Sequence, residues 1–211
     1  MGRARHLRVV PAERPTERPA AESVGSISDA ALVDHALEGD LWAEDVLVRR
    51  YLREVARLVA RLLGSHQDVD EVVQETFLAA LEGLDRLREP AAFRGWLLRI
   101  AVNQTRRCIR KRRMLRALGL DRGEPDAALS ALADESLGPE RMAELRAVDE
   151  VLDRLPAAQR LAWMLRYVEG HTLADISRLC SCSLATTKRR VAAAHARVLA
   201  ATGEPGAADA T

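Results

Sequence analysis

The stretch TLADISRLCSCSLATTKRRVAAAHARVL, residues 172–199, decides the fold that this sequence predicts. Thr172 and Asp175 have the spacing of a capping box, in which the threonine hydroxyl and the carboxylate each accept the other residue's backbone N–H. We therefore expect a short helix to begin after Thr172. Ser183 is a favoured residue for capping a second helix. Residues 180–182 are predicted to form the turn between the two.

The second helix is predicted to be amphipathic. By helical spacing, positions 187, 191, 194 and 198 lie on one stripe, which is mostly apolar, and the opposite side carries Lys188, Arg189 and Ala192. A short helix, a tight turn and a basic helix without acidic residues are what docking in the DNA major groove requires. The pattern favours a DNA-binding helix-turn-helix over the alternative, a helical hairpin with a solvated basic face.

Helical periodicity continues on the N-terminal side of this stretch. Four helices are expected: around 32–37 with an end at Gly39, over about 43–63 with an end at Gly64, from a capping box at 65–68, and over about 92–113. The β-branched and aromatic runs typical of strands are missing, and aromatic residues make up 3% of the chain. The fold class is therefore predicted to be all-α.

Composition divides the chain into domains. Residues 1–27 mix Arg, Glu and Pro without periodicity and are expected to be a disordered tail. Between 117 and 140 the periodicity gives way to Gly, Pro, Ala and acidic residues, the composition of a flexible linker. We expect two small helical domains, 28–116 and 141–201, joined by this acidic linker, with the helix-turn-helix in the second. Residues 202–211 are expected to form another disordered tail.

Charge is strongly segregated, although the formal net charge is only +1. Residues 90–120 contain many Arg and Lys residues and no Asp or Glu, and the segment after Asp175 is free of acids until Glu204. Basic stretches without acids are the electrostatic footprint of nucleic-acid binding. The distribution of charge therefore supports DNA binding where the net charge does not.

Several other functions are disfavoured by the sequence. The three cysteines, Cys108, Cys180 and Cys182, cannot form a disulfide framework and fit a reducing cytosol. A Cys-x-Cys pair without a second cluster is weak evidence for zinc or redox sensing. No apolar run approaches the ~20 residues of a membrane span, and no nucleophile–base pair or Gly-rich phosphate loop is present. We expect a soluble protein without catalytic site, metal, cofactor, small-molecule substrate or membrane insertion.

Motifs in both halves of the chain resemble those of extracytoplasmic-function (ECF) sigma factors, of the sigma-70 family of bacterial RNA polymerase. The matches to the family's fourth conserved region are Leu155-Pro156, Arg160, Leu165-Arg166-Tyr167, Glu169-Gly170, Ala174-Asp175-Ile176, Ser183, Thr186 and Lys188. The matches to its second region are DVDEVVQETF (68–77), Phe93-Arg94, Trp96-Leu97 and Ile100-Ala101-Val102-Asn103. Together the matches cover about residues 28–113 and 141–200.

The resemblance implies a dissociable subunit that binds core RNA polymerase and directs promoter-specific transcription initiation. The implied partners are the β′ clamp helices and the β flap of the polymerase, promoter DNA and an anti-sigma factor. The implied localisation is cytoplasmic, with the anti-sigma factor able to hold the protein at the inner membrane. Two alternatives stay open: a stand-alone helix-turn-helix regulator, and a degenerate sigma that titrates an anti-sigma factor. A stand-alone regulator has no need for the DVDEVVQETF helix.

The resemblance also implies three sets of binding residues. Those expected at the −35 element are Ser183, Thr186, Lys188, Arg189, Arg190 and Arg197. Those expected at the −10 element and in promoter melting are Phe93, Arg99, Asn103, Arg106, Arg107, Arg110 and Lys111. Those expected to bind core polymerase are Asp68, Asp70, Glu71, Gln74 and Glu75. Asn103 occupies the family's −10-contacting position, and residues 87–93 correspond to its base-capturing loop.

Four positions within these motifs have structural consequences of their own. Phe93 and Trp96 have the spacing of core residues that face Ile100, which favours packing over base stacking for both. Ser181 stands where the family commonly has Gly, which predicts strain in a left-handed turn. Thr187 places a hydroxyl on the inner stripe of the second helix. Either of the last two changes is expected to lower stability or shift the turn.

Overall fold

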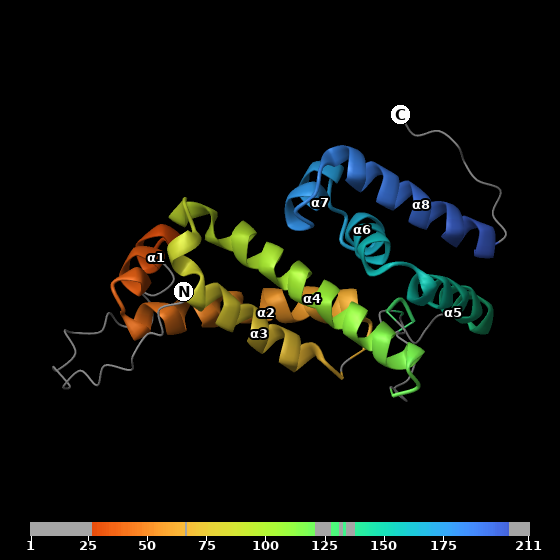
Figure 1. The fold of residues 1–211 in the computed structure, drawn as a ribbon, viewed down its shortest axis with the longest axis horizontal. Coiled ribbons are helices and arrows are strands. Elements are labelled where there is room, and N and C mark those ends of the chain that lie inside the picture. Colours follow the sequence, from red (N-terminus) through yellow and green to blue (C-terminus); the bar gives the residue numbers. More distant parts are fainter. Residues whose placement is uncertain (1–26, 66, 121–127, 131–132, 134–137, 203–211) are drawn as a thin grey trace.

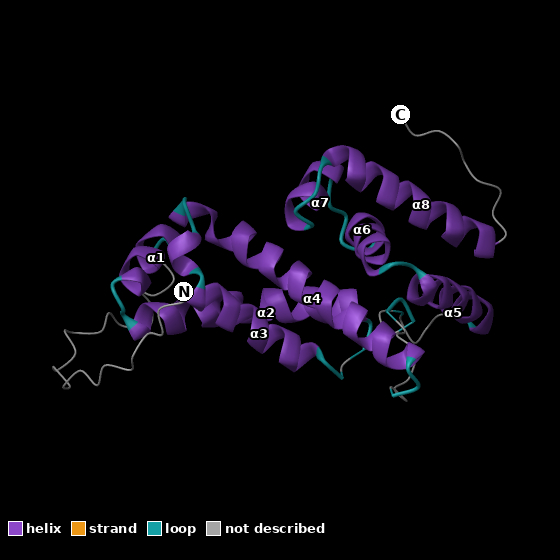
Figure 2. Ribbon diagram, in the orientation of Figure 1, coloured by secondary structure: helices purple, strands orange, loops and turns teal. Residues whose placement is uncertain are grey.

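The computed structural model describes residues 27–65, 67–120, 128–130, 133 and 138–202. Within these residues every regular element is a helix and no strand is present (Figure 2). The predicted all-α class is therefore confirmed. The expected N-terminal tail up to residue 26, most of the linker and the tail from residue 203 lie outside the described residues. None of the described helices combines the length and hydropathy needed to cross a membrane.

The first half of the chain forms a bundle around the long helix α2. Its elements are α1 (Asp29–Leu37), α2 (Leu41–Leu63), α3 (Val69–Glu82), η2 (Leu84–Arg86), η3 (Pro90–Ala92) and α4 (Phe93–Ala117). The Ser28 hydroxyl caps α1 by accepting the N–H of Ala31 at 3.2 Å. Gly39 and Gly64 have positive φ just after α1 and α2, as predicted.

The capping box predicted at residues 65–68 is wrong. Asp68 precedes α3 but makes no side-chain cap bond. Its carboxylate instead accepts a hydrogen bond from Arg112 of α4, and the same guanidinium donates to the Ser65 hydroxyl at 2.8 Å. A charge-assisted bond to a largely buried guanidinium is stronger than a neutral cap bond. The tertiary partner therefore outcompetes the local one.

The second half forms a smaller bundle that contains the helix-turn-helix. Its helices are α5 (Pro139–Arg154), α6 (Ala157–Tyr167), α7 (Leu173–Leu179) and α8 (Leu184–Thr202). Leu155-Pro156 separates α5 from α6, because proline has no N–H for a continuous helix. Leu161 and Leu165 of α6, Ile176 of α7 and Val191 of α8 all belong to the buried core.

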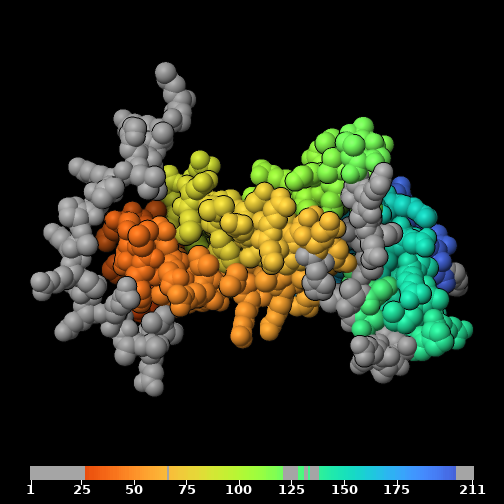
Figure 3. Space-filling model, turned by 90° about the horizontal axis from the view of Figure 1, so that it is seen from below, coloured from red at the N-terminus to blue at the C-terminus, as the bar shows by residue number. Residues whose placement is uncertain are grey.

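The two halves pack against each other along α4 (Figure 1). In Figure 1, α2 and α3 lie on one side of α4, and α6 and α7 lie on the other. Their buried apolar residues belong to one continuous cluster. Figure 3 shows the surface of α1–α3 at one end, that of α5–α8 at the other, and the green C-terminal end of α4 on the side of α5.

Part of the linker is held in place. Asp149 of α5 accepts hydrogen bonds from the backbone N–H groups of Leu129, at 2.8 Å, and Ser130, at 2.9 Å. The neighbouring Ala128 is buried against Gly64, where an added Cβ would lie 2.4 Å from Ala128. The segment expected to be a flexible tether is thus anchored at residues 128–130.

Candidate nucleic-acid interface

The helix-turn-helix begins with the predicted capping box. The Thr172 hydroxyl accepts the N–H of Asp175 at 3.1 Å, and the Asp175 carboxylate accepts the N–H of Thr172 at 3.3 Å. Hydrogen bonds from the Thr172 side chain and from Arg178 lower the pKa of Asp175 to about 2. The start of α7 is therefore fixed by its own sequence.

The turn and the start of α8 also follow local rules. Ser181 is the one described non-glycine residue with positive φ, at 51°, so the predicted left-handed turn is confirmed. The Ser183 hydroxyl accepts the N–H of Thr186 at 3.2 Å, which is the expected N-cap bond. It also donates to the Thr186 hydroxyl at 2.9 Å. The Ser183 and Thr186 hydroxyls, which are predicted to contact DNA, thus also stabilise the N-terminal end of α8.

α8 has the two faces that its periodicity predicts. Its buried residues are Thr187, Val191, Ala194 and Val198. The Thr187 hydroxyl is satisfied, because it donates to the carbonyl oxygen of Ser183 at 3.2 Å. The exposed face carries three of the residues expected at the −35 element: Lys188, Arg189 and Arg197. Arg190 is half-buried and turns toward α4.

The basic residues of α4 separate onto two sides. Arg106 and Arg110 line a cleft of about 570 Å³ with Arg190 of α8. Arg107 and Lys111 line a different cleft, of about 590 Å³, between α4 and α3. The set expected along one phosphate-binding helix is therefore not one surface. Arg99 is exposed nearer the start of the helix, and Asn103 is half-buried.

Phe93 is a core residue, and its expected contact with DNA is corrected here. Its side chain is 1% exposed. Its ring packs against those of Tyr51, at 5.6 Å between centroids, and Trp96, at 6.1 Å. The predicted core role of Phe93 is confirmed, while Trp96 is half-buried with one edge open to a cleft. A fully packed ring has no face left for a base.

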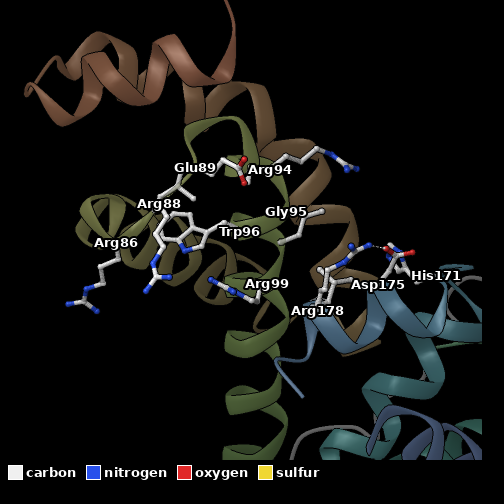
Figure 4. Close-up of a pocket in the computed structure, with 14 residues that line it drawn as sticks. Arg86, Arg88, Glu89, Arg94, Gly95, Trp96, Arg99, His171, Asp175 and Arg178 are labelled. Atoms are coloured by element: carbon white, nitrogen blue, oxygen red, sulfur yellow. Dashed lines mark hydrogen bonds and ion pairs between the residues drawn. The ribbon is translucent and has the colours of Figure 1, made fainter. Parts of the chain in front are cut away.

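The loop before α4 forms a basic cleft that the sequence did not single out. The cleft has a volume of about 850 Å³ and includes Arg86, Arg88 and Arg99 from this side. Figure 4 shows these arginines around Trp96, and the paired Asp175 and Arg178 on the neighbouring α7. Arg86 and Arg88 were missed because Asp85 and Glu89 flank them in the sequence, so they do not stand out as a basic stretch. The available signal was their position in and next to residues 87–93, which the resemblance implies to be a base-capturing loop.

α3 carries the acidic set expected to bind polymerase. Asp70, Glu71, Gln74 and Glu75 are exposed on it, and Glu71 pairs with Lys111 of α4 at 3.6 Å. Asp68 differs from the others because it is half-buried. Burial opposes ionisation of Asp68, but hydrogen bonds from Arg112 and Cys108 outweigh this effect and lower its pKa. Asp68 therefore holds α3 against α4.

The cysteines have the properties of structural residues. All three are free thiols. Burial is the main cause that raises the pKa of Cys108 to about 12 and that of Cys180 to about 11. Thiols with raised pKa values are poor nucleophiles and poor metal ligands. In the described part of the chain, no group of three or more His, Cys, Asp or Glu residues could hold a metal ion.

Two known family models match this chain, one in each half. Sigma-70 region 2 matches residues 47–114, and sigma-70 region 4 matches residues 145–198. The chain is 33% identical over 179 residues to the ECF RNA polymerase sigma-E factor of Escherichia coli (strain K12), covering 78% of this chain and 89% of that protein. It is 32% identical over 171 residues to the ECF RNA polymerase sigma factor SigM of Mycobacterium tuberculosis, covering 81% and 83%.

Solved structures share the fold. CnrH in complex with the cytosolic domain of CnrY aligns with a TM-score of 0.54 and 25% identity, over 84% of this chain and 99% of that chain. The sigma factor RpoE in complex with the anti-sigma factor NepR from Bartonella quintana aligns with a TM-score of 0.53 and 23% identity, over 74% and 94%.

Proposed function

Because the chain belongs to the ECF sigma factors of the sigma-70 family, we propose that three of its surfaces divide the work of transcription initiation. The −35 surface is on α8: the exposed Ser183, Lys188, Arg189 and Arg197 with the half-buried Thr186 and Arg190. The −10 residues are on α4 and lie on different sides of it: Arg106 and Arg110 line the cleft shared with Arg190, Arg107 and Lys111 line the cleft toward α3, and Arg99 and Asn103 lie nearer the start of the helix. The docking surface is the acidic face of α3: Asp70, Glu71, Gln74 and Glu75, with Asp68 as its anchor to α4.

The docking surface is the observation that carries this proposal. Four acidic or amide side chains are exposed on one helix, next to the basic α4. A regulator that works alone needs only its helix-turn-helix, whereas an acidic helix face suits a basic helical surface on a partner. We assign this face to the β′ clamp helices of core polymerase. The C-terminal half is assigned to the β flap.

Binding to core polymerase tests the docking surface. Glu75→Arg should reduce capture of core polymerase at least tenfold, because it places a cation where an acid meets a basic partner. Glu38→Arg makes the same charge change at an exposed residue after α1 and should bind normally. Equal capture of core polymerase by both variants would show that the acidic face of α3 does not bind it.

Promoter binding by the holoenzyme tests the −35 surface. Lys188→Ala and Arg189→Ala should each weaken binding and lower the salt dependence, by about 0.9 in the slope of log K against log salt for each lost phosphate contact. Arg141→Ala removes a charge that is 75% exposed on α5 and should leave the slope unchanged. An unchanged slope in the α8 variants would show that these residues do not contact phosphates.

Transcription by reconstituted holoenzyme on genomic DNA, with mapped transcripts, tests the whole function. An active sigma factor should give transcripts from a defined promoter class. A protein that binds an anti-sigma factor but yields no transcript on any template would instead be a titrating decoy.

We further assign to this protein no catalytic activity of its own, no cofactor and a cytoplasmic location. Its structural neighbours were solved in complexes with CnrY and NepR, which supports an anti-sigma factor as a partner here, one that holds the protein at the inner membrane when its promoters are silent. Purifying the protein from membrane and soluble fractions and identifying the proteins that come with it tests this partner. Recovery with no membrane-associated partner would contradict the membrane part of the assignment.

A further inference from the structure

The cleft that Arg106 and Arg110 of α4 share with Arg190 of α8 is positively charged. Arg113 and residues 156–158 complete its walls, and no acidic side chain is among the residues that line it. Its volume of about 570 Å³ lies within the range of small-molecule sites. The start of α6 forms one wall, and α6 itself lies between α4 and α8 (Figure 1). Three helices thus enclose one basic space.

The guanidinium groups of Arg106, Arg110 and Arg190 have no partner in the described part of the chain. None of the three makes a hydrogen bond or an ion pair with another described residue. Arg116, further along α4, is by contrast paired with Asp153 of α5 at 2.5 Å. The cleft therefore gathers positive charge that the described part of the protein leaves uncompensated.

Two of these charges act on the same buried thiol. Burial raises the pKa of Cys180, and the positive charges of Arg190 and Arg106 oppose this rise. Both arginines are also half-buried, so water screens their mutual repulsion less than it screens that of fully exposed groups. An anion between them would turn this repulsion into attraction.

The N-terminal end of α6 adds partial positive charge to the cleft. The first N–H groups of a helix have no intrahelical acceptor, and anions bind favourably there. Pro156 precedes α6 and makes no side-chain cap bond. Ala157 and Ala158, the first residues of the helix, line the cleft, and their small side chains leave the helix end open to a ligand.

We propose that this cleft binds a small anion that contains a chain of phosphate groups, either as free polyphosphate or as the triphosphate of a nucleotide. A guanidinium matches two oxygens of one phosphate in a fork-like geometry. Arg106 and Arg110 come from one helix and Arg190 from another, so a chain of phosphates can engage both sides where a single phosphate engages one. A DNA duplex is too wide for this space.

Arg113 has a different part in the site. Its guanidinium donates to the carbonyl oxygens of Leu155 and, at 3.2 Å, Arg154. These bonds hold the chain just before Pro156 against α4, and so position the start of α6 beside the arginines. We assign ligand binding to the three arginines without partners and a positioning role to Arg113.

Calorimetric titration of the full-length protein with sodium tripolyphosphate, without DNA or polymerase, tests the site. Arg106→Gln and Arg190→Gln should each weaken binding about tenfold or more, because each removes a hydrogen bond between charged groups. Orthophosphate should bind the wild type about tenfold or more weakly than tripolyphosphate, because it lacks the linked groups that engage both sides. Physiological ionic strength keeps general attraction between exposed charges small.

Arg107→Gln and Arg189→Gln are the matched controls. Each removes the same charge at the neighbouring position of the same helix, but Arg107 lines the cleft toward α3 and Arg189 is exposed outside the arginine cleft. Both variants should bind tripolyphosphate as the wild type does. Equal weakening within each pair of neighbours would reveal general charge attraction and overturn the proposal. If a half-buried arginine variant does not fold, Arg110→Gln, at an exposed position, takes its place.

Titration with ATP identifies the source of the phosphate chain. Equal affinity for ATP and tripolyphosphate supports a site that reads the chain alone, and tighter binding of ATP supports one that also contacts the nucleoside. Binding of neither probe, or equal affinity for orthophosphate and tripolyphosphate, would overturn the proposal. The inference goes beyond the proposed function and does not depend on it, because absence of transcription by the holoenzyme would leave these affinities unchanged.

Discussion

The guanidinium of Arg160 on α6 donates a hydrogen bond to the carbonyl oxygen of Leu63, the last residue of α2, at 2.7 Å. The two residues are 97 positions apart in the sequence. This bond gives a partner to a helix-end carbonyl that no residue of α2 itself can satisfy. It also fixes where the C-terminal half sits on the N-terminal one. The chain segment next to Leu63 is therefore a sensitive point for mutation.

Gly64→Ala should destabilise the protein and release the anchored part of the linker. Gly64 has φ of 70°, and an added Cβ would lie 2.4 Å from Ala128. The left-handed backbone alone costs about 1–2 kcal/mol for a residue with a Cβ. Gly39→Ala is the control, because Gly39 also has positive φ but has nothing within 4 Å of an added Cβ.

Chemical denaturation and hydrogen exchange check this prediction. The free energy of unfolding should be lower in both variants than in the wild type, and lowest in Gly64→Ala. Only Gly64→Ala should speed exchange at the amides of Leu129 and Ser130. Identical effects of the two substitutions would mean that the contact with Ala128 is unimportant.

Ser181→Gly should stabilise the helix-turn-helix. Ser181 is exposed and has φ of 51°, a conformation that glycine adopts without strain. We expect a gain of about 0.5–1 kcal/mol in the free energy of unfolding. Ser181→Ala keeps the Cβ and should give no gain. Thermal denaturation of the three proteins measures the difference, and a gain in the alanine variant would point to a side-chain effect instead.

Arg112→Gln should destabilise the N-terminal half at neutral pH and change its response to acid. The Asp68 carboxylate would lose its ionic partner, at a cost of about 1–3 kcal/mol. The folded pKa of Asp68 is lowered in the wild type. Its contribution to stability is therefore present above the ordinary carboxyl pKa and lost as the pH falls toward the folded value.

Unfolding free energies measured from neutral pH down to about pH 3 test this linkage. The gap between wild type and Arg112→Gln should narrow as the pH falls. Arg99→Gln, at an exposed position on the same helix, should track the wild type throughout. A gap that stays constant with pH would exclude the Asp68 pair as its source.

Cys108 and Cys180 should resist alkylation in the folded protein. A pKa of about 11 for Cys180, raised by burial from 9.0, leaves roughly a hundredfold less thiolate near neutral pH. Mass spectrometry after iodoacetamide treatment should therefore show at least that difference in rate between folded and urea-unfolded protein at both residues. Fast alkylation of folded Cys180 would restore the hypothesis of a redox sensor.

Local features of the sequence predicted the helix-turn-helix in detail. The bond between Thr172 and Asp175, the cap at Ser183 and the buried stripe that starts at Thr187 all involve residues within a few positions of each other. Their geometry follows from helical periodicity and from orphan N–H groups, which depend little on the rest of the chain. The left-handed conformation of Ser181 followed instead from the resemblance, because the family commonly has Gly at this position.

Features that depend on distant partners were predicted poorly. Ser65 and Asp68 have the spacing of a capping box. In the folded protein, however, both side chains accept hydrogen bonds from the Arg112 guanidinium of α4. Arg106 and Arg107 are neighbours in sequence and look alike, yet they line different clefts because helical neighbours point about 100° apart. Which of them faces the second half depends on packing between helices.

The sequence alone determined the helices, their caps, their buried stripes and the two modules that identify the family, because these depend on hydrogen bonds and periodicities within a few turns. Only the tertiary structure decided that Asp68 anchors α3 and that Arg160 and Asp153 join the two halves. Those outcomes depend on which side chains meet across the fold. Competition between near and distant partners for the same charged group settles them, and no local pattern records its result.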